Sequence, residues 1–218
     1  MKISKVWIWR GMVVVCAAVI LVSWLMPWWN ANIYEISPEA VQIRPWGLVN
    51  NVGAEYGPLI KKAEMPDWFA PFMWSFLAIM IICLALSLVA KEVLVNLGPL
   101  NFIVPKWVKR RALPSWLCGG VGIAYCVCVL VMFLYASQRT PEFWHTPFLG
   151  TTHISLGDSY NSDVETSLQP GYFLAWIVGI ALTVMGIYRH KFLGLPLQKT
   201  TKPAESLPMP GGLASRHP

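Results

Sequence analysis

The chain has 218 residues, of which 56% are apolar and only 13% carry a charged side chain. In soluble domains about a quarter of the residues are charged, so this composition excludes an ordinary soluble protein and indicates an integral membrane protein. The formal net charge is +6. Because the basic residues gather on one side of the predicted membrane, this charge reflects topology, and we expect no nucleic-acid partner.

Four apolar runs are each long enough to cross about 30 Å of hydrocarbon as a helix. They cover residues 11–28, 69–90, 114–136 and 171–188. A cleavable signal peptide is the alternative for the first run, because Lys2, Lys5 and Arg10 precede it. However, the run ends in Trp-Leu-Met-Pro-Trp-Trp, where signal peptidase requires small residues. We therefore expect a retained helix and an all-α integral membrane protein, a four-transmembrane-helix bundle.

The basic residues predict which loops are cytoplasmic, since Lys and Arg are retained on that side. Three precede the first run, five lie within 91–113 and five follow residue 188, whereas the two other loops hold four together. Both termini of this multi-pass protein of the cell membrane are therefore predicted to be cytoplasmic. The transmembrane domain is predicted to cover 1–192, with outer loops 30–67 and 137–170 and an inner loop 91–113. The Pro-, Gly-, Ser- and Lys-rich stretch 193–218 is expected to be a disordered cytoplasmic tail.

The outer loops contain short stretches that are typical of strands. In the first loop these are Ile33–Ile36 and Val41–Arg44, with Ser-Pro-Glu-Ala between them as the turn candidate. The second loop has Thr-Thr-His-Ile-Ser-Leu-Gly-Asp-Ser-Tyr, a strand-turn candidate. We expect the two outer loops to form one small extracytoplasmic β-sheet over the helices.

Four residues of the first loop are expected to anchor this sheet to the bundle: Trp29, Arg44, Trp46 and Gly47. Trp46 lies too far along the chain to be a simple headgroup anchor, and we expect it to fold back near Trp28 and Trp29. Pro45 removes a backbone donor at the end of the second strand, and Gly47 permits a turn. Arg44 is expected to face the acidic surface of the outer loops.

Sites of chemistry are scarce in this sequence. The four apolar runs contain no ionisable residue, which argues against a pump or an ion-coupled transporter. No established catalytic motif is present, so we assign no catalytic residue and no cofactor. The second outer loop holds His145, His153, Asp158 and Asp163, with Glu165 nearby. Imidazole and carboxylate groups can bind a divalent metal, but a solvated acidic loop is the alternative.

Two further patterns concern the helices and the lipid. Small residues recur at four-residue spacing, which lets helices approach closely, inside one bundle or between subunits. They are Gly120 and Ala124 in the third run and Ala175, Gly179 and Thr183 in the fourth. A basic cluster in the inner loop suits contact with anionic lipid, at about 1 kcal/mol per residue, although topological retention explains it equally well. It consists of Lys106, Lys109, Arg110 and Arg111.

The predicted topology and Trp29, followed after a strand-sized gap by Trp46-Gly47-Leu48, resemble claudin-like tetraspan proteins. Claudins have a Trp and then Gly-Leu-Trp flanking a cysteine pair in this loop. Here Val49 stands in place of the second Trp, and the outer loops contain no Cys. The resemblance implies that Trp29 and the Trp46–Leu48 turn anchor the outer sheet, and that the protein acts by adhesion, assembly or partner binding.

The leading hypothesis is therefore a non-enzymatic membrane protein that acts through its outer loops. It would be an accessory or assembly subunit, or a self-associating adhesion-type protein, and its partners would be membrane lipid and other membrane subunits or further copies of itself. Two alternatives remain. One is a small redox or metal-dependent membrane subunit with its site in the second outer loop, and the other is an oligomeric passive channel.

Overall fold

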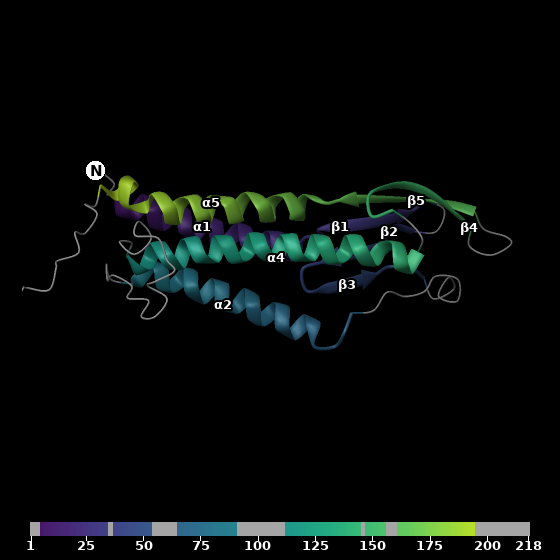
Figure 1. Ribbon diagram of the computed structural model, residues 1–218, viewed down its shortest axis with the longest axis horizontal. Helices are drawn as coiled ribbons and strands as arrows, with labels where there is room; N and C mark the ends of the chain where they lie inside the picture. The colour runs from purple at the N-terminus through teal and green to yellow at the C-terminus, as the bar shows by residue number, and fades with distance from the viewer. Residues whose placement is uncertain are drawn as a thin grey trace, which may run out of the picture.

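The computed structural model describes residues 5–34, 37–53, 65–90, 112–144, 147–155 and 161–194. Four long helices in these ranges run side by side (Figure 1). They are α1 (Lys5–Leu25), α2 (Phe69–Val89), α4 (Leu113–Trp144) and α5 (Pro170–Leu193). Each has the length and apolar composition needed to cross a bilayer, so the chain is a multi-pass membrane protein. Most of the predicted inner loop, residues 91–111, and the tail from residue 195 lie outside the described residues.

Helix α4 continues about two turns beyond the predicted end at residue 136. Residues 137–144 were expected in a loop because the apolar run stops before them, but they are helical. Ala136 is buried in one cluster with residues of the sheet, and the Thr140 hydroxyl donates to its carbonyl at 2.8 Å. Helix α4 thus continues alongside the sheet, which replaces hydrocarbon as its packing surface (Figure 1).

The connections between helices supply five antiparallel strands, which confirms the predicted sheet of two loops. The strands are β1 (Trp29–Ile33), β2 (Ser37–Arg44), β3 (Gly47–Asn50), β4 (Gly150–Ser155) and β5 (Asn161–Leu168). Their order is β3-β2-β1-β5-β4. The pairing of β1 with β5 joins the two loops, with Trp29 opposite Leu168 and Ile33 opposite Val164.

The connection between β1 and β2 differs from the prediction. Strand β2 begins at Ser37, so the segment expected to form the turn is strand instead. The register between β1 and β2 shifts after Ala31, and Glu39 has a φ of 59°. There the Asn32 side-chain oxygen accepts a hydrogen bond from the Glu39 N–H at 2.9 Å. A side-chain contact across the irregularity stabilises this conformation, and local turn preferences do not reveal it.

The turn between β2 and β3 agrees better with the sequence. Pro45 and Trp46 form a two-residue turn in which Arg44 pairs with Gly47. The φ of Gly47 is 157°, a value that residues with a side chain rarely adopt. The turn therefore favours glycine at this position.

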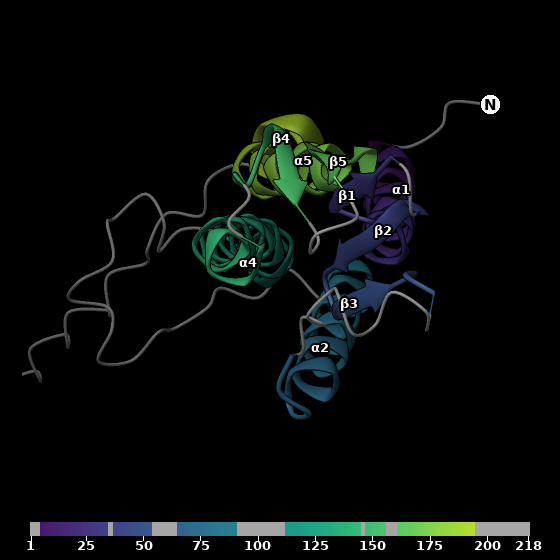
Figure 2. The same cartoon turned by 90° about the vertical axis from the view of Figure 1, so that its right-hand side faces the viewer.

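The sheet stands on one end of the bundle, called the sheet end below. The opposite end, where α1 begins and α5 ends, is called the terminal end. Viewed along the bundle, the sheet runs diagonally across the helix ends, from β4 and β5 near α5 to β3 near α2 (Figure 2). One hydrophobic cluster fills the helix bundle and a second lies under the sheet. The boundary falls between adjacent residues, because Trp28 belongs to the first cluster and Trp29 to the second.

Candidate functional site

A buried hydrogen-bonded cluster connects three helices beneath the sheet. The Ser23 hydroxyl donates to the Gly171 carbonyl at 2.8 Å and accepts from the Tyr125 hydroxyl at 3.2 Å. The Trp28 indole N–H donates to the Ser23 carbonyl at 2.9 Å, and its ring contacts Tyr125 and Tyr172 edge-on. Polar groups inside a bilayer are costly unless they are paired. This cluster therefore fixes how α1, α4 and α5 meet directly below β1.

Trp29, one of the predicted anchors, connects the sheet to α4. Its indole N–H donates to the Phe148 carbonyl at 2.7 Å, and the two rings stack with centroids 5.8 Å apart. Phe148 in turn meets Phe133 of α4 edge-on at 5.2 Å. Only 3% of Trp29 is exposed, so the indole donor is satisfied inside the protein and not by a lipid headgroup.

Trp46 connects the sheet to α2. Its ring stacks on Trp74, with centroids 6.2 Å apart. We expected Trp46 to lie near Trp28 and Trp29; it packs against the helix cluster that contains Trp28, and its stacking partner comes from α2. Arg44 also differs from expectation: its guanidinium lies 5.6 Å from the Trp46 ring centroid and donates to the Gln42 side-chain oxygen at 3.1 Å. Arg44 therefore packs over the turn.

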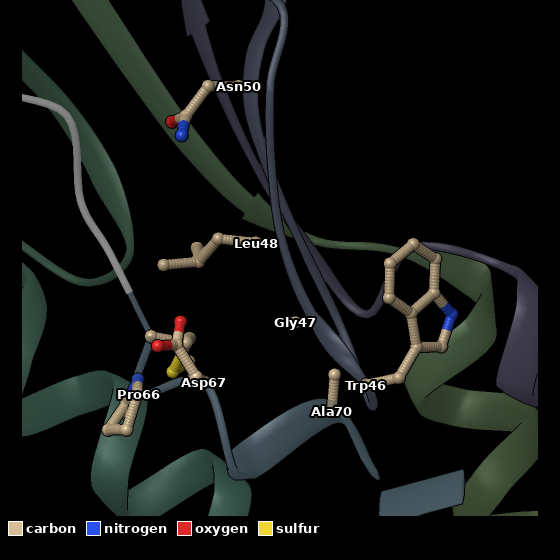
Figure 3. Close-up of a pocket in the computed structure, with 8 residues that line it drawn as sticks. Trp46, Gly47, Leu48, Asn50, Pro66, Asp67 and Ala70 are labelled. Atoms are coloured by element: carbon tan, nitrogen blue, oxygen red, sulfur yellow. The ribbon is translucent and has the colours of Figure 1, made fainter.

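A hollow of about 590 Å³ separates β3 from the segment that begins α2. Figure 3 shows Leu48 and Asn50 leaning from β3 toward Pro66 and Asp67, while Trp46 projects to the other side of the strand. Further lining is supplied by Gly47, Met65 and Ala70. Sequence reasoning missed this site, because it depends on how α2 and β3 approach one another in space. It offers one carboxylate, an amide and the backbone of β3, which suits binding rather than acid–base chemistry.

The charged side chains that the structure describes at the sheet end are mostly acidic. Arg44 is the only Lys or Arg among them, whereas four carboxylates are present: Glu39, Asp67, Asp163 and Glu165. The Tyr34 hydroxyl donates to Glu165 on the neighbouring strand, and this hydrogen bond raises the pKa of the phenol above its usual value. The sheet end therefore attracts cations.

Two of the four predicted metal ligands are described, and they form a pair. His153 Nδ1 lies 2.6 Å from an Asp163 carboxylate oxygen across β4 and β5, with more than half of each side chain exposed. His145 and Asp158 lie outside the described residues. Among the residues that the structure describes, no three His, Cys, Asp or Glu side chains come together as a metal site.

The close contact between α4 and α5 involves partly different small residues from those predicted. A Cβ added at Gly122 would lie 2.5 Å from the Thr183 nitrogen and 2.6 Å from the Gly179 carbonyl oxygen. Gly179 and Thr183 thus face α4, and Ala175 is fully buried on the same helix. On α4, Gly120 is exposed with nothing near its Cβ position. Its predicted neighbour in the pattern, Ala124, is half-buried.

The terminal end contains a buried cation. Arg189, which directly follows the predicted apolar run 171–188, lies within α5 and is only 6% exposed. Its guanidinium lies 4.7 Å from the ring centroid of Trp9 on α1. The predicted lipid-binding cluster falls outside the described residues: Lys106, Lys109, Arg110 and Arg111. Described basic residues at this end are Lys5, Arg10, Arg189 and Lys191.

No protein-family model, curated protein or solved structure matches this chain. Its architecture is four long apolar helices with a five-stranded antiparallel sheet that comes from the α1–α2 and α4–α5 connections.

Proposed function

We propose that this multi-pass membrane protein is a non-catalytic assembly or adhesion-type subunit that binds partners, or copies of itself, through its five-stranded sheet. We place the sheet end outside the cell and both termini in the cytoplasm. The positive-inside rule supports this orientation, because the described basic residues at the terminal end contrast with the acidic sheet end.

The attachment of the sheet to the bundle is the observation that carries the proposal. Trp28 contacts α4 and α5, Trp29 contacts α4 through Phe148, and Trp46 stacks on α2. The sheet therefore has a fixed position, while β3 and β4 stay at its edges among the described strands. Natural proteins usually cover or charge an exposed sheet edge, because its unpaired backbone groups recruit other chains. A fixed sheet with accessible edges suits recognition of another protein.

The resemblance to claudin-like tetraspan proteins supports the same function. Four helices carry a sheet built by two loops, and the Trp46-Gly47-Leu48 stretch lies at the turn into β3. The strands pair without a cysteine bridge, since the five cysteines all lie in helices and are free thiols. Adhesion or assembly through the sheet end follows from this resemblance.

Native mass spectrometry of the protein extracted in mild detergent tests the proposal, combined with photo-crosslinking from single positions. A crosslinking side chain at Thr151 on the β4 edge should capture a partner or a second copy. The matched control is Ile177, which is 63% exposed on the lipid-facing side of α5 and should capture mainly lipid. A single chain with lipid alone in the mass spectrum, and no protein crosslink from the sheet end, would refute the proposed function.

A further inference from the structure

The edge of β3 that faces away from β2 has free backbone groups among the described strands, and the hollow adjoins the same strand. The Asn51 N–H donates to the Ala40 carbonyl at 2.9 Å, which fixes a hydrogen-bonded pair between β2 and the end of β3. The Ile43 carbonyl points away from β3, toward the β1 side of β2, where it accepts a hydrogen bond from the Trp28 N–H at 2.8 Å. Because such bonds alternate along antiparallel strands, Leu48, opposite Ile43, occupies a non-hydrogen-bonded position. Its N–H and C=O point away from β2, where no other described strand lies.

The hollow lies on the side of β3 to which Leu48 and Asn50 project, so it can receive side chains of a strand added at this edge. Its volume is about 590 Å³, and its far wall is formed by Met65, Pro66 and Asp67. A strand that adds to an edge lies about 4.8 Å away and needs space for alternate side chains. Leu48 and Asn50 project toward this space (Figure 3), so the site has an apolar contact and a polar contact two residues apart.

The charge around the hollow selects the kind of segment that fits. Asp67 is exposed, and its carboxylate faces the space between Pro66 and β3 (Figure 3). The other described carboxylates of the sheet end add to the same negative field, and Arg44, the single described Lys or Arg there, packs over the turn. A basic segment is therefore attracted, and an acidic one is repelled.

We propose that the β3 edge and the adjoining hollow bind an extended, basic segment of a partner protein by strand addition. The Leu48 backbone supplies the hydrogen bonds, and Asp67 pairs with a Lys or Arg of the segment. This inference rests on the proposed function and specifies which part of the sheet meets the partner. It differs from pairing at β4, the other edge, whose described charged group is the His153–Asp163 pair.

Binding of a defined peptide to the full chain in lipid nanodiscs tests the inference. The probe is a fluorescent acetyl-Lys-Val-Lys-Val-Lys-Val-amide, followed by anisotropy. We expect saturable binding that falls at least about tenfold when alternate peptide nitrogens are methylated, because methylation removes donors for the strand ladder. The peptide with Glu in place of Lys should not bind. Methylation leaves the protein unchanged, so this comparison does not depend on the folding of any variant.

Two substitutions locate the site. Leu48→Pro removes an N–H that does not pair with β2, so it should weaken binding about tenfold or more while the fold is retained. Asp67→Lys should reverse the preference in favour of the Glu peptide, whereas Asp163→Asn on β5 should change little. Equal binding of the methylated peptide, or no effect of Asp67→Lys, would overturn the inference. If the Thr151 crosslink forms but the basic peptide does not bind, the β3 site is wrong and the proposed function stands.

Discussion

Substitution of Gly122 by Ala probes one of the close contacts between α4 and α5. The added Cβ would lie 2.5 Å from the Thr183 nitrogen, 2.6 Å from its hydroxyl oxygen and 2.6 Å from the Gly179 carbonyl oxygen. Ordinary contacts to a Cβ begin at 3.4 Å, so α4 and α5 must separate by about 1 Å. A gap of that size removes roughly a quarter to a half of the dispersion attraction of each contact that opens. Two of the three clashing atoms belong to the backbone and cannot rotate away.

We expect Gly122→Ala to lower the free energy of unfolding by about 1–3 kcal/mol, the usual cost of overpacking. The gain in helix propensity, about 1 kcal/mol, offsets this loss in full only at its lower limit. The matched control is Gly120→Ala on the same helix, where an added Cβ meets nothing within 4 Å. This control should be neutral or stabilising.

The assay is unfolding of the purified protein by titration from mild detergent into SDS, followed by tryptophan fluorescence. The difference in unfolding midpoint between the two alanine variants reports the contribution of the Gly122 contact, because both variants replace a glycine by alanine in the same helix. Equal midpoints for Gly120→Ala and Gly122→Ala would refute the assignment of Gly122 to the α4–α5 contact. A midpoint for Gly120→Ala below that of Gly122→Ala would indicate that the predicted face of α4 forms the contact instead.

Three other predictions follow from contacts near the sheet. Ser23→Ala leaves the buried Tyr125 hydroxyl without its acceptor and should lower the free energy of unfolding by about 1–3 kcal/mol in the SDS titration. The double variant Ser23→Ala, Tyr125→Phe should lose less stability than the sum of the two single variants, and strict additivity would contradict the hydrogen bond. Trp29→Phe keeps a ring but removes the indole donor, so hydrogen exchange in β1 should accelerate by up to about tenfold, and unchanged exchange would argue against this anchor. Because the hydrogen bond to Glu165 raises the pKa of Tyr34, Glu165→Gln should lower that pKa toward its usual value in a difference titration against Tyr34→Phe. Because its pKa is raised in the folded protein, Tyr34 favours the folded state at pH values below the usual tyrosine pKa, and this effect is lost as the pH rises through the folded-state pKa. Tyr34 is exposed, so we expect a shifted titration of the phenol with little change in the free energy of unfolding.

The sequence predicted the elements whose signals are local. The run 69–90 corresponds closely to α2, Phe69–Val89. A helix that crosses the hydrocarbon layer needs about 20 consecutive apolar residues, so the length of the apolar run predicts the bounds of the helix. The strand at Val41–Arg44 ends where Pro45 interrupts it, as expected. Alternation and turn residues were also sufficient to predict that both loops contribute strands to one sheet.

The sequence could not predict which surfaces meet. Spacing of small residues pointed to Gly120 on α4, but the rotation of α4 against α5 places Gly122 at the contact. A closer reading of the Gly-Gly-Val-Gly stretch could have suggested this alternative face. The extension of α4 to Trp144 likewise depends on the sheet beside it, and the position of Trp46 depends on α2.

Taken by itself, the sequence determined that this chain has four apolar helices of membrane-spanning length and builds a sheet from two loops, because hydrophobic length and strand periodicity are properties of contiguous residues. Only the tertiary structure decided that Leu48, whose backbone groups turn away from β2, lines a hollow together with Asp67. That arrangement depends on the register of β3 and on the position of α2. Both bring together residues that are distant in the sequence, and no local sequence pattern indicates such a contact.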